Sequence, residues 1–263
     1  MVDADRVFFK INSVFCLFVG LNLVGKAVGQ WRSGLTADVA YQDLDKYMDL
    51  ILRHFAQQSF YFAVFAGYIP AMMLISLVVS FYLYLHERSR SVSLIAFVFG
   101  TAMGAVWISR RLFGMAMTVV ALKYMNATSA AAKQDLFAQV KSLYYYDSLG
   151  NVLSGQTSLI AYALFGFLFL RGKGLEYAVG ALFLGSSVTL LVFQIITPSS
   201  WFVEAAGVLV LPAIAFILSS VLLWQYKPSV EVWAQEVPRP FDPDEDETVA
   251  DNPAPITIEA RDS

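Results

Sequence analysis

Residues 93–125, SLIAFVFGTAMGAVWISRRLFGMAMTVVALKYM, are the stretch that decides the fold. At about 1.5 Å per residue, this apolar run is long enough to cross a hydrocarbon core about 30 Å thick. Two adjacent arginines, Arg110 and Arg111, interrupt it. If the span is centred near Trp107, both lie close to the membrane midplane, where a charge costs about 2.5–3.5 kcal/mol on insertion scales. Arginines at that depth are candidates for function.

Helical spacing predicts different surroundings for the two arginines. At about 100° per residue, Gly100, Gly104 and Arg111 share one face of the helix. Small residues allow a second helix to approach that face closely, so we expect Arg111 in the interior of a bundle. Arg110 points about a quarter-turn away. It either lines the same cavity or reaches toward lipid headgroups.

The composition of the whole chain indicates a multi-pass membrane protein. Of its 263 residues, 57% are hydrophobic and 15% are charged, and the mean hydropathy of +0.58 is too high for an ordinary soluble domain. The net charge is −3, so we expect no nucleic-acid partner. Cys16 is the only cysteine, which excludes an intrachain disulfide and a thiolate metal cluster.

Apolar runs and amphipathic segments alternate along the chain and predict an all-α membrane helix bundle with six transmembrane helices and two outer amphipathic helices. The six spans cover about residues 7–30, 60–85, 93–125, 152–170, 175–197 and 202–226. The amphipathic helices cover about residues 36–55 and 129–146, and we expect both to lie on the outer membrane surface, with the second ending near Asp147 to Asn151. Pro70 and Pro212 should bend the second and sixth spans.

Two regions at the ends of the chain need separate interpretation. The first span also resembles a cleaved secretory signal, but Asn12, Asn22 and Lys26 are typical of a helix retained in a bundle. Residues 1–226 thus form the six-span domain. Residues 227–263 are rich in Pro, Asp and Glu, and we predict a disordered acidic tail.

Short basic turns predict the orientation of the bundle. One turn carries Arg88 and Arg90, and another carries Arg171 and Lys173. Positive residues near span ends favour the cytoplasmic side. Both termini fall on the same side as these turns, so we expect them to be cytoplasmic.

Three features of the chain resemble features of a known family. An outer amphipathic segment follows the first span, Tyr82-Leu83-Tyr84-Leu85 precedes a basic turn, and the third span contains arginine. This layout resembles a bacterial six-span family catalogued as domain of unknown function 4386, over roughly residues 7–226. The resemblance implies a bacterial inner-membrane topology and no assigned activity. The acidic residue that the family tends to place shortly after its third-span arginine is absent here.

Polar residues of five spans converge on the predicted outer half of the bundle. The candidate ligand-binding residues are Asn22, Lys26, Arg110, Arg111, Gln156, Gln194 and Glu204. We interpret them as a cationic pocket, open outward, in which Glu204 pairs with Arg111. Such a pocket suits a carboxylate, a phosphate or a lipid headgroup. The alternative is a structural network in which Glu204 pairs with one arginine and the amides satisfy the rest.

The expected function is binding or transport of a small anionic or amphipathic ligand, with membrane lipids as further partners. The alternative is an accessory or assembly subunit that contacts another protein or a second copy of the chain. No activated nucleophile, acid–base pair or metal motif is recognisable, so we expect neither an enzyme nor a cofactor. His54 and His86 fall on opposite sides of the membrane in this topology and are not expected to share a metal.

Overall fold

The computed structural model describes residues 2–33, 48, 50, 52–53, 64–195 and 206–226, and these residues are helical apart from short connections. Six of the helices are long and apolar enough to cross a membrane. They comprise Asp5–Gly29, Phe65–Leu85, Arg90–Asn126, Ala130–Leu170, Leu175–Ile195 and Ala206–Gln225. The predicted fold class, an all-α membrane helix bundle, is confirmed.

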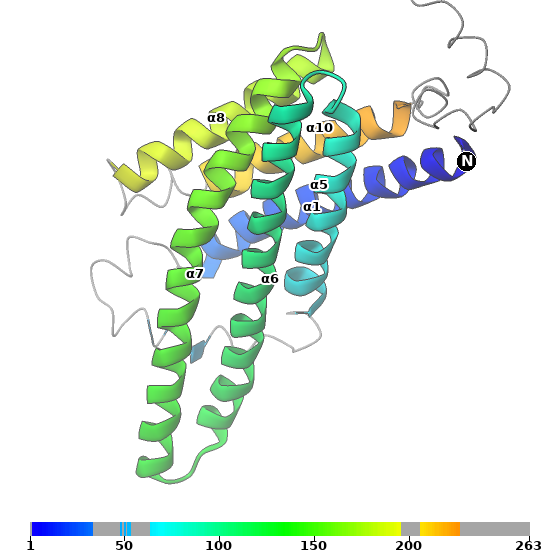
Figure 1. The fold of residues 1–263 in the computed structure, drawn as a ribbon. Coiled ribbons are helices and arrows are strands. Elements are labelled where there is room, and N and C mark those ends of the chain that lie inside the picture. Colours follow the sequence, from blue (N-terminus) through cyan, green and yellow to red (C-terminus); the bar gives the residue numbers. More distant parts are fainter. Residues whose placement is uncertain are drawn as a thin grey trace, which may run out of the picture.

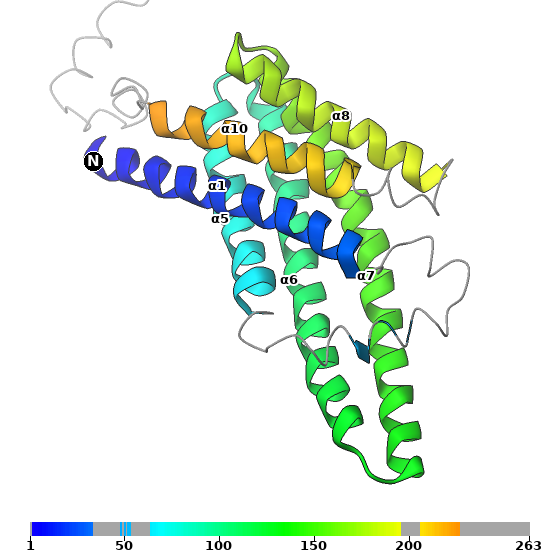
Figure 2. The ribbon, with the colours of Figure 1, turned by 180° about the vertical axis from the view of Figure 1, so that it is seen from behind.

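The helices form two layers that cross obliquely (Figure 1). One layer holds α5 (Ile69–Leu85), α6 (Arg90–Asn126) and α7 (Ala130–Leu170). The other holds α1 (Val2–Ser33), α8 (Leu175–Ile195) and α10 (Leu211–Gln225). Seen from behind, α1 and α10 lie side by side across the first layer (Figure 2). The first span is therefore packed as a helix of the bundle.

Two π-helical turns precede the prolines of the second and sixth spans. Helix η1 (Val64–Tyr68) leads into α5, which has Pro70 in its first turn. Helix η2 (Ala206–Val210) leads into α10, which has Pro212 at the same place. Proline lacks an N–H and crowds the preceding turn, so regular helix is disfavoured there. The irregularities expected at both prolines thus occur as π-helical turns.

Aromatic rings and close helix approaches hold the layers together. The Phe81 ring contacts four other phenylalanine rings from α7, α8 and α10, namely Phe165, Phe169, Phe183 and Phe216. The predicted small-residue face of α6 packs on α5. A Cβ on Gly100 would lie 2.8 Å from Val78, and one on Gly104 would lie 2.8 Å from Ile75. Larger residues at these two positions would separate the helices.

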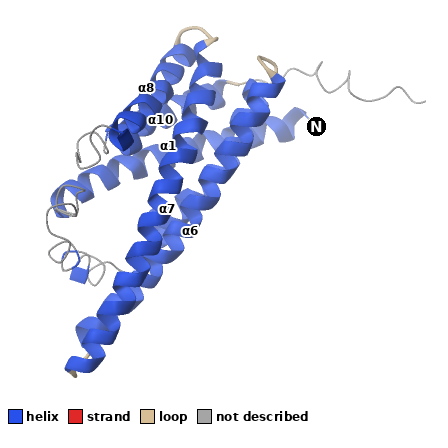
Figure 3. Cartoon of the chain, turned by 60° about the vertical axis from the view of Figure 1, so that its left-hand side comes forward, coloured by secondary structure: helices blue, strands red, loops and turns tan. Residues whose placement is uncertain are grey.

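Helices α6 and α7 form a hairpin that extends past the other helices (Figure 3). The Ser129 side chain caps α7 by accepting a hydrogen bond from the Ala132 N–H. The break predicted near Asp147 to Asn151 is absent, because α7 runs without interruption for 41 residues. Its length of about 60 Å exceeds the hydrocarbon core. The second amphipathic segment is therefore the first half of α7, and it packs against α6 through Val140 and Ala121.

Most of the first amphipathic segment and all of the predicted tail lie outside the described residues. Within the segment, Met48 and Leu52 are buried in the same cluster as Ala121 and Val140. These two apolar side chains thus contact the hairpin.

The bundle has two distinct ends. We call the end with residues 86–89 and 171–174 the loop end, and the opposite half of the hairpin, residues 110–150 with the turn at Ala127 to Ser129, the hairpin end. The Tyr226 ring lies 4.5 Å from Phe9 and 4.9 Å from Tyr84, measured between centroids, so the described chain ends share the loop end with the basic turns. Burial raises the pKa of the Tyr226 hydroxyl, and the Glu87 carboxylate raises it further.

Candidate functional site

Arg111 lies near the middle of α6, beside η1. A Cβ on Gly67 of η1 would be 3.2 Å from Cδ of Arg111. Helix α6 rises about 30 Å from its start to Arg110 and about 24 Å from there to its end. The helix is longer than a single span needs, so the depth of the two arginines in the membrane stays a prediction.

Arg110 points toward α7 and pairs with Asp147. Its Nε donates to Oδ1 at 3.2 Å and its Nη2 donates to Oδ2 at 3.4 Å. The side chain crosses Gly150, where a Cβ would lie 2.8 Å from Cγ of Arg110. The direction of Arg110, which the sequence left open, is thus toward the neighbouring helix of the hairpin. Glu204, the expected acidic partner of Arg111, lies outside the described residues.

Arg111 points toward η1, the turn that leads into α5, and Gly100 and Gly104 of the same helix pack on α5 itself. Its Nε is buried and has no hydrogen-bond partner among the described residues. Lys26 of α1 places its Nζ 6.0 Å from the centroid of the Trp107 ring, within electrostatic range of both arginines. We call Lys26, Arg110 and Arg111 the cation cluster. In the described part of the chain, these three cations adjoin a single carboxylate, Asp147.

The remaining predicted residues divide into those near the cation cluster and those away from it. Asn22 lies one turn before Lys26 on α1, and its Oδ1 is buried without a partner in the described segments. Gln194 of α8 lies over α7, because a Cβ on Gly155 would be 2.5 Å from its Nε2. Gln156 is exposed and is not among the residues that line the pocket described below, so its place at a ligand site stays a prediction.

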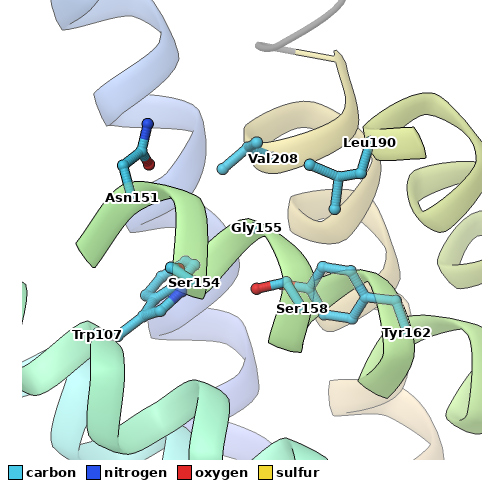
Figure 4. Close-up of a pocket in the computed structure, with 8 residues that line it drawn as sticks. All are labelled: Trp107, Asn151, Ser154, Gly155, Ser158, Tyr162, Leu190 and Val208. Atoms are coloured by element: carbon cyan, nitrogen blue, oxygen red, sulfur yellow. The ribbon is translucent and has the colours of Figure 1, made fainter. Parts of the chain in front are cut away.

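A pocket lies next to the cation cluster, between α6, α7, α8 and η2 (Figure 4). The space inside it that the centre of a water-sized sphere can occupy is about 20 Å³, which is room for about one water molecule. The lining residues are Trp107, Asn151, Ser154, Gly155, Ser158, Tyr162, Leu190 and Val208. In α7, the inward positions near Gln156 are thus occupied by the buried side chains of Ser154 and Ser158. Among the described residues, no group of three or more His, Cys, Asp or Glu side chains is placed to hold a metal ion.

Sequence reasoning missed Asp147, Trp107 and Tyr162 as site residues. Asp147 was detectable, because it and Arg110 are almost equally distant from the turn that contains Ala127. Residues equally distant from the turn of an antiparallel helix pair lie opposite each other. No comparable sequence signal marks Trp107 or Tyr162, since apolar spans contain many aromatic residues that only pack.

The six apolar helices indicate a multi-pass membrane protein. Its likeness to the six-span family named above is a resemblance in layout. No family model, no curated protein and no solved structure matches the chain.

Proposed function

We propose that the protein binds a small anionic or amphipathic ligand at the cation cluster. The observation that carries this proposal is the buried Nε of Arg111, which lacks a hydrogen-bond partner in the described part of the chain. A buried donor without an acceptor costs about 1–3 kcal/mol, and more when it is charged. An anion beside Lys26 and Arg111 supplies the acceptor and balances the surplus positive charge. Binding of this kind is also the first step of transport.

The chemistry of the cluster favours an oxyanion. Arginine presents a planar set of donors that matches carboxylate and phosphate groups. Asp147 holds Arg110 in place through both carboxylate oxygens, so Arg110 contributes mainly fixed charge. Arg111 and Lys26 then provide the donors for the ligand. A dissolved acid, inorganic phosphate and a lipid headgroup share this chemistry.

A binding experiment on the full chain tests the proposal and separates the two sources. In phosphatidylcholine nanodiscs, we expect valerate and inorganic phosphate to bind by calorimetry, and Arg111→Gln to weaken binding at least tenfold. Arg171→Gln, the same change at an exposed loop-end arginine, is the control and should have no effect. If phosphatidylglycerol nanodiscs abolish valerate binding, the site holds a lipid headgroup. Equal affinities for the wild type and Arg111→Gln would contradict the proposal.

We further propose that the hairpin end is extracytoplasmic and both termini are cytoplasmic. The basic residues of the loop-end turns support this orientation. Ser89→Cys and Ser129→Cys, each in a Cys16→Ala background, report the two ends. An impermeant thiol reagent applied to intact cells should label Ser129→Cys and spare Ser89→Cys, and the opposite result would invert the topology.

An accessory role in a larger assembly is the second candidate function. Beyond Arg111, α6 continues to Asn126, about 22 Å farther along the helix axis. Several apolar side chains on this part of the hairpin are exposed, namely Leu112, Val119, Leu122, Met125, Tyr145, Tyr146 and Leu149. Exposed apolar surface of this kind is typical of protein contacts. Native mass spectrometry after mild extraction would identify a bound protein or a second copy, and a monomer without either would argue against this role.

A further inference from the structure

The loop end presents positive charge that the described carboxylates do not balance. Its exposed basic side chains are Arg6, Arg90, Arg171 and Lys173, and the half-buried Lys10 belongs to the same end. We call these residues the loop-end basic surface. None of them forms an ion pair with a described carboxylate. Since Glu176 pairs with Arg88, the acids that remain among the described side chains of this end are Asp5 and Glu87.

The described chain leaves the bundle beside this surface. The Tyr226 ring lies 4.5 Å from the Phe9 ring of α1 and 4.9 Å from the Tyr84 ring of α5, measured between centroids. Phe9 is next in sequence to a member of the surface, and the Tyr84 ring lies one turn before the first basic turn. The second basic turn meets the first, because Arg171 Nη1 donates to the Arg88 carbonyl at 3.4 Å. The start of α1 and the end of α10 lie side by side in both views (Figures 1 and 2).

The sequence that follows Tyr226 has the opposite charge. Residues 227–263 contain ten acidic and three basic residues. Half of these acids fall within residues 242–247, namely Asp242, Asp244, Glu245, Asp246 and Glu247. We call residues 242–247 the acidic run. Its first residue is sixteen positions beyond Tyr226, and a chain of that length spans at most about 55 Å. The acidic run can therefore reach the whole loop-end basic surface.

We propose that the acidic run docks on the loop-end basic surface of the same chain. Each contact between exposed opposite charges is weak. The covalent link, however, keeps the run at an effective concentration in the millimolar range, so several weak contacts together hold it. Salt screens exposed charges, and high salt should therefore release the run. The proposal uses no residue of the cation cluster, so it is independent of the proposed anion binding.

Anionic lipid headgroups are the competing occupant of this surface. Basic residues at a membrane surface attract them. The acidic run has the advantage because it is attached beside the surface, and because its own negative charge repels anionic lipids. Lipid reaches the basic residues only by displacing the run. Nanodiscs with and without phosphatidylglycerol separate the two occupants.

A distance measurement on the full chain tests the proposal. In a Cys16→Ala background, spin labels at Ser89→Cys and Thr248→Cys report the separation of the first basic turn and the end of the acidic run. In phosphatidylcholine nanodiscs at low salt, we expect electron paramagnetic resonance to give a short, narrow distance distribution. An undocked chain of this length gives a broad distribution with a mean of about 25 Å or more. We expect that broad distribution in 1 M salt.

Two matched sets of tail substitutions identify the segment that docks. The first set neutralises the acidic run by Asp242→Asn, Asp244→Asn, Glu245→Gln, Asp246→Asn and Glu247→Gln, and should broaden the distribution at low salt. The second set removes the same charge outside the run by Glu231→Gln, Glu236→Gln, Asp251→Asn, Glu259→Gln and Asp262→Asn. The distribution should then stay narrow. Equal broadening by the two sets would overturn the assignment to the acidic run.

Substitutions on the bundle identify the surface that receives the run. Arg90→Gln, Arg171→Gln and Lys173→Gln together should broaden the distribution as much as the neutralised run does. The control set, Lys123→Gln, Lys133→Gln and Lys141→Gln, removes the same charge from the hairpin end and should have no effect. Thermal unfolding verifies that each variant is folded.

Two further results would overturn the proposal. The first is the same distribution for the wild type and for the neutralised run at low salt, because the run would then not dock. The second is a narrow distribution in phosphatidylcholine that becomes broad in phosphatidylglycerol nanodiscs, which would assign the surface to lipid headgroups. Neither result bears on anion binding at Arg111, which is tested separately by Arg111→Gln.

Discussion

Each end of the bundle contains an arginine–carboxylate ion pair, but the two pairs have different surroundings. At the loop end, Arg88 pairs with Glu176 and also donates to the Leu168 carbonyl at 3.0 Å. The Tyr84 hydroxyl donates to the same carboxylate at 2.5 Å. We call Tyr84, Arg88 and Glu176 the loop-end clasp, which joins α5 and its following turn to α8. Its single arginine has both a carboxylate and a carbonyl as acceptors.

The hairpin end contains an arginine–carboxylate pair of similar exposure but a different charge balance. Arg110 and Asp147 are 21% and 24% exposed, compared with 22% and 18% for Arg88 and Glu176. Near Arg110, however, Arg111 and Lys26 add positive charge without a second carboxylate in the described part of the chain. A satisfied pair joins helices, whereas a surplus of donors supports the anion binding that we propose. Substitutions at the two ends should therefore affect different properties.

Breaking the loop-end clasp should have the largest effect on stability. Glu176→Gln removes the acceptor charge shared by Arg88 and Tyr84, and we expect a loss of about 2 kcal/mol in the free energy of unfolding. Anion affinity should not change. Thermal or denaturant unfolding in nanodiscs measures the loss. Glu87→Gln, at an exposed neighbouring acid, is the control, and an equal loss in both variants would remove the distinction between the ends.

Arg111→Gln should produce the opposite pattern. The change removes a cation that has two like charges nearby, so stability should stay within about 0.5 kcal/mol of the wild type or increase. Phosphate affinity should fall at least tenfold, about 1.4 kcal/mol. Calorimetry and unfolding on the same samples measure both quantities. A stability loss comparable to that of Glu176→Gln would identify Arg111 as a structural residue.

Asp147→Asn tests the charge balance directly, with a smaller effect. Loss of the ion pair with Arg110 should cost about 0.5–1 kcal/mol of stability, because the pair is partly exposed. Removing the carboxylate also removes a competitor for the cations, so phosphate affinity should rise severalfold. Calorimetry at low and high salt checks the electrostatic origin, since salt should reduce the gain. Weaker phosphate binding would mean that Asp147 positions Arg110 for the ligand.

The fold was predictable where it depends on local sequence. Apolar runs longer than a span and the spacing of Gly100, Gly104 and Arg111 identify six helices and the inward face of α6. These signals are local, so they do not require knowledge of which helices are neighbours. The second amphipathic segment shows the limit. Its pattern fits a membrane surface and a helical hairpin equally well, and only its contacts with α6 make it part of α7.

The candidate site was predictable in part for the same reason. Lys26, Arg110 and Arg111 were recognised because charges are rare in apolar spans. Asp147 lies in a polar segment where a carboxylate is unremarkable by sequence alone. The pocket at Trp107 and Tyr162 depends on how four elements pack around it, which no single segment specifies.

The smallest predicted effect concerns the room that Gly150 leaves for Arg110. Glycine within a helix is about 1 kcal/mol less favourable than alanine, so Gly→Ala alone should stabilise α7. At Gly150, however, the new Cβ would lie 2.8 Å from Cγ of Arg110. The arginine must shift, and this weakens its contact with Asp147. Gly150→Ala should therefore leave stability within about 0.5 kcal/mol of the wild type, because the two effects offset each other.

Gly25→Ala is the matched control, because Gly25 is also inside a helix and a Cβ there would meet nothing within 4 Å. It should show the gain from helix propensity without a clash. The difference between the two variants in unfolding free energy then measures the displacement of Arg110 alone. If Gly150→Ala gains as much stability as Gly25→Ala, Arg110 moves aside at no cost, and its pairing with Asp147 contributes little to the hairpin end.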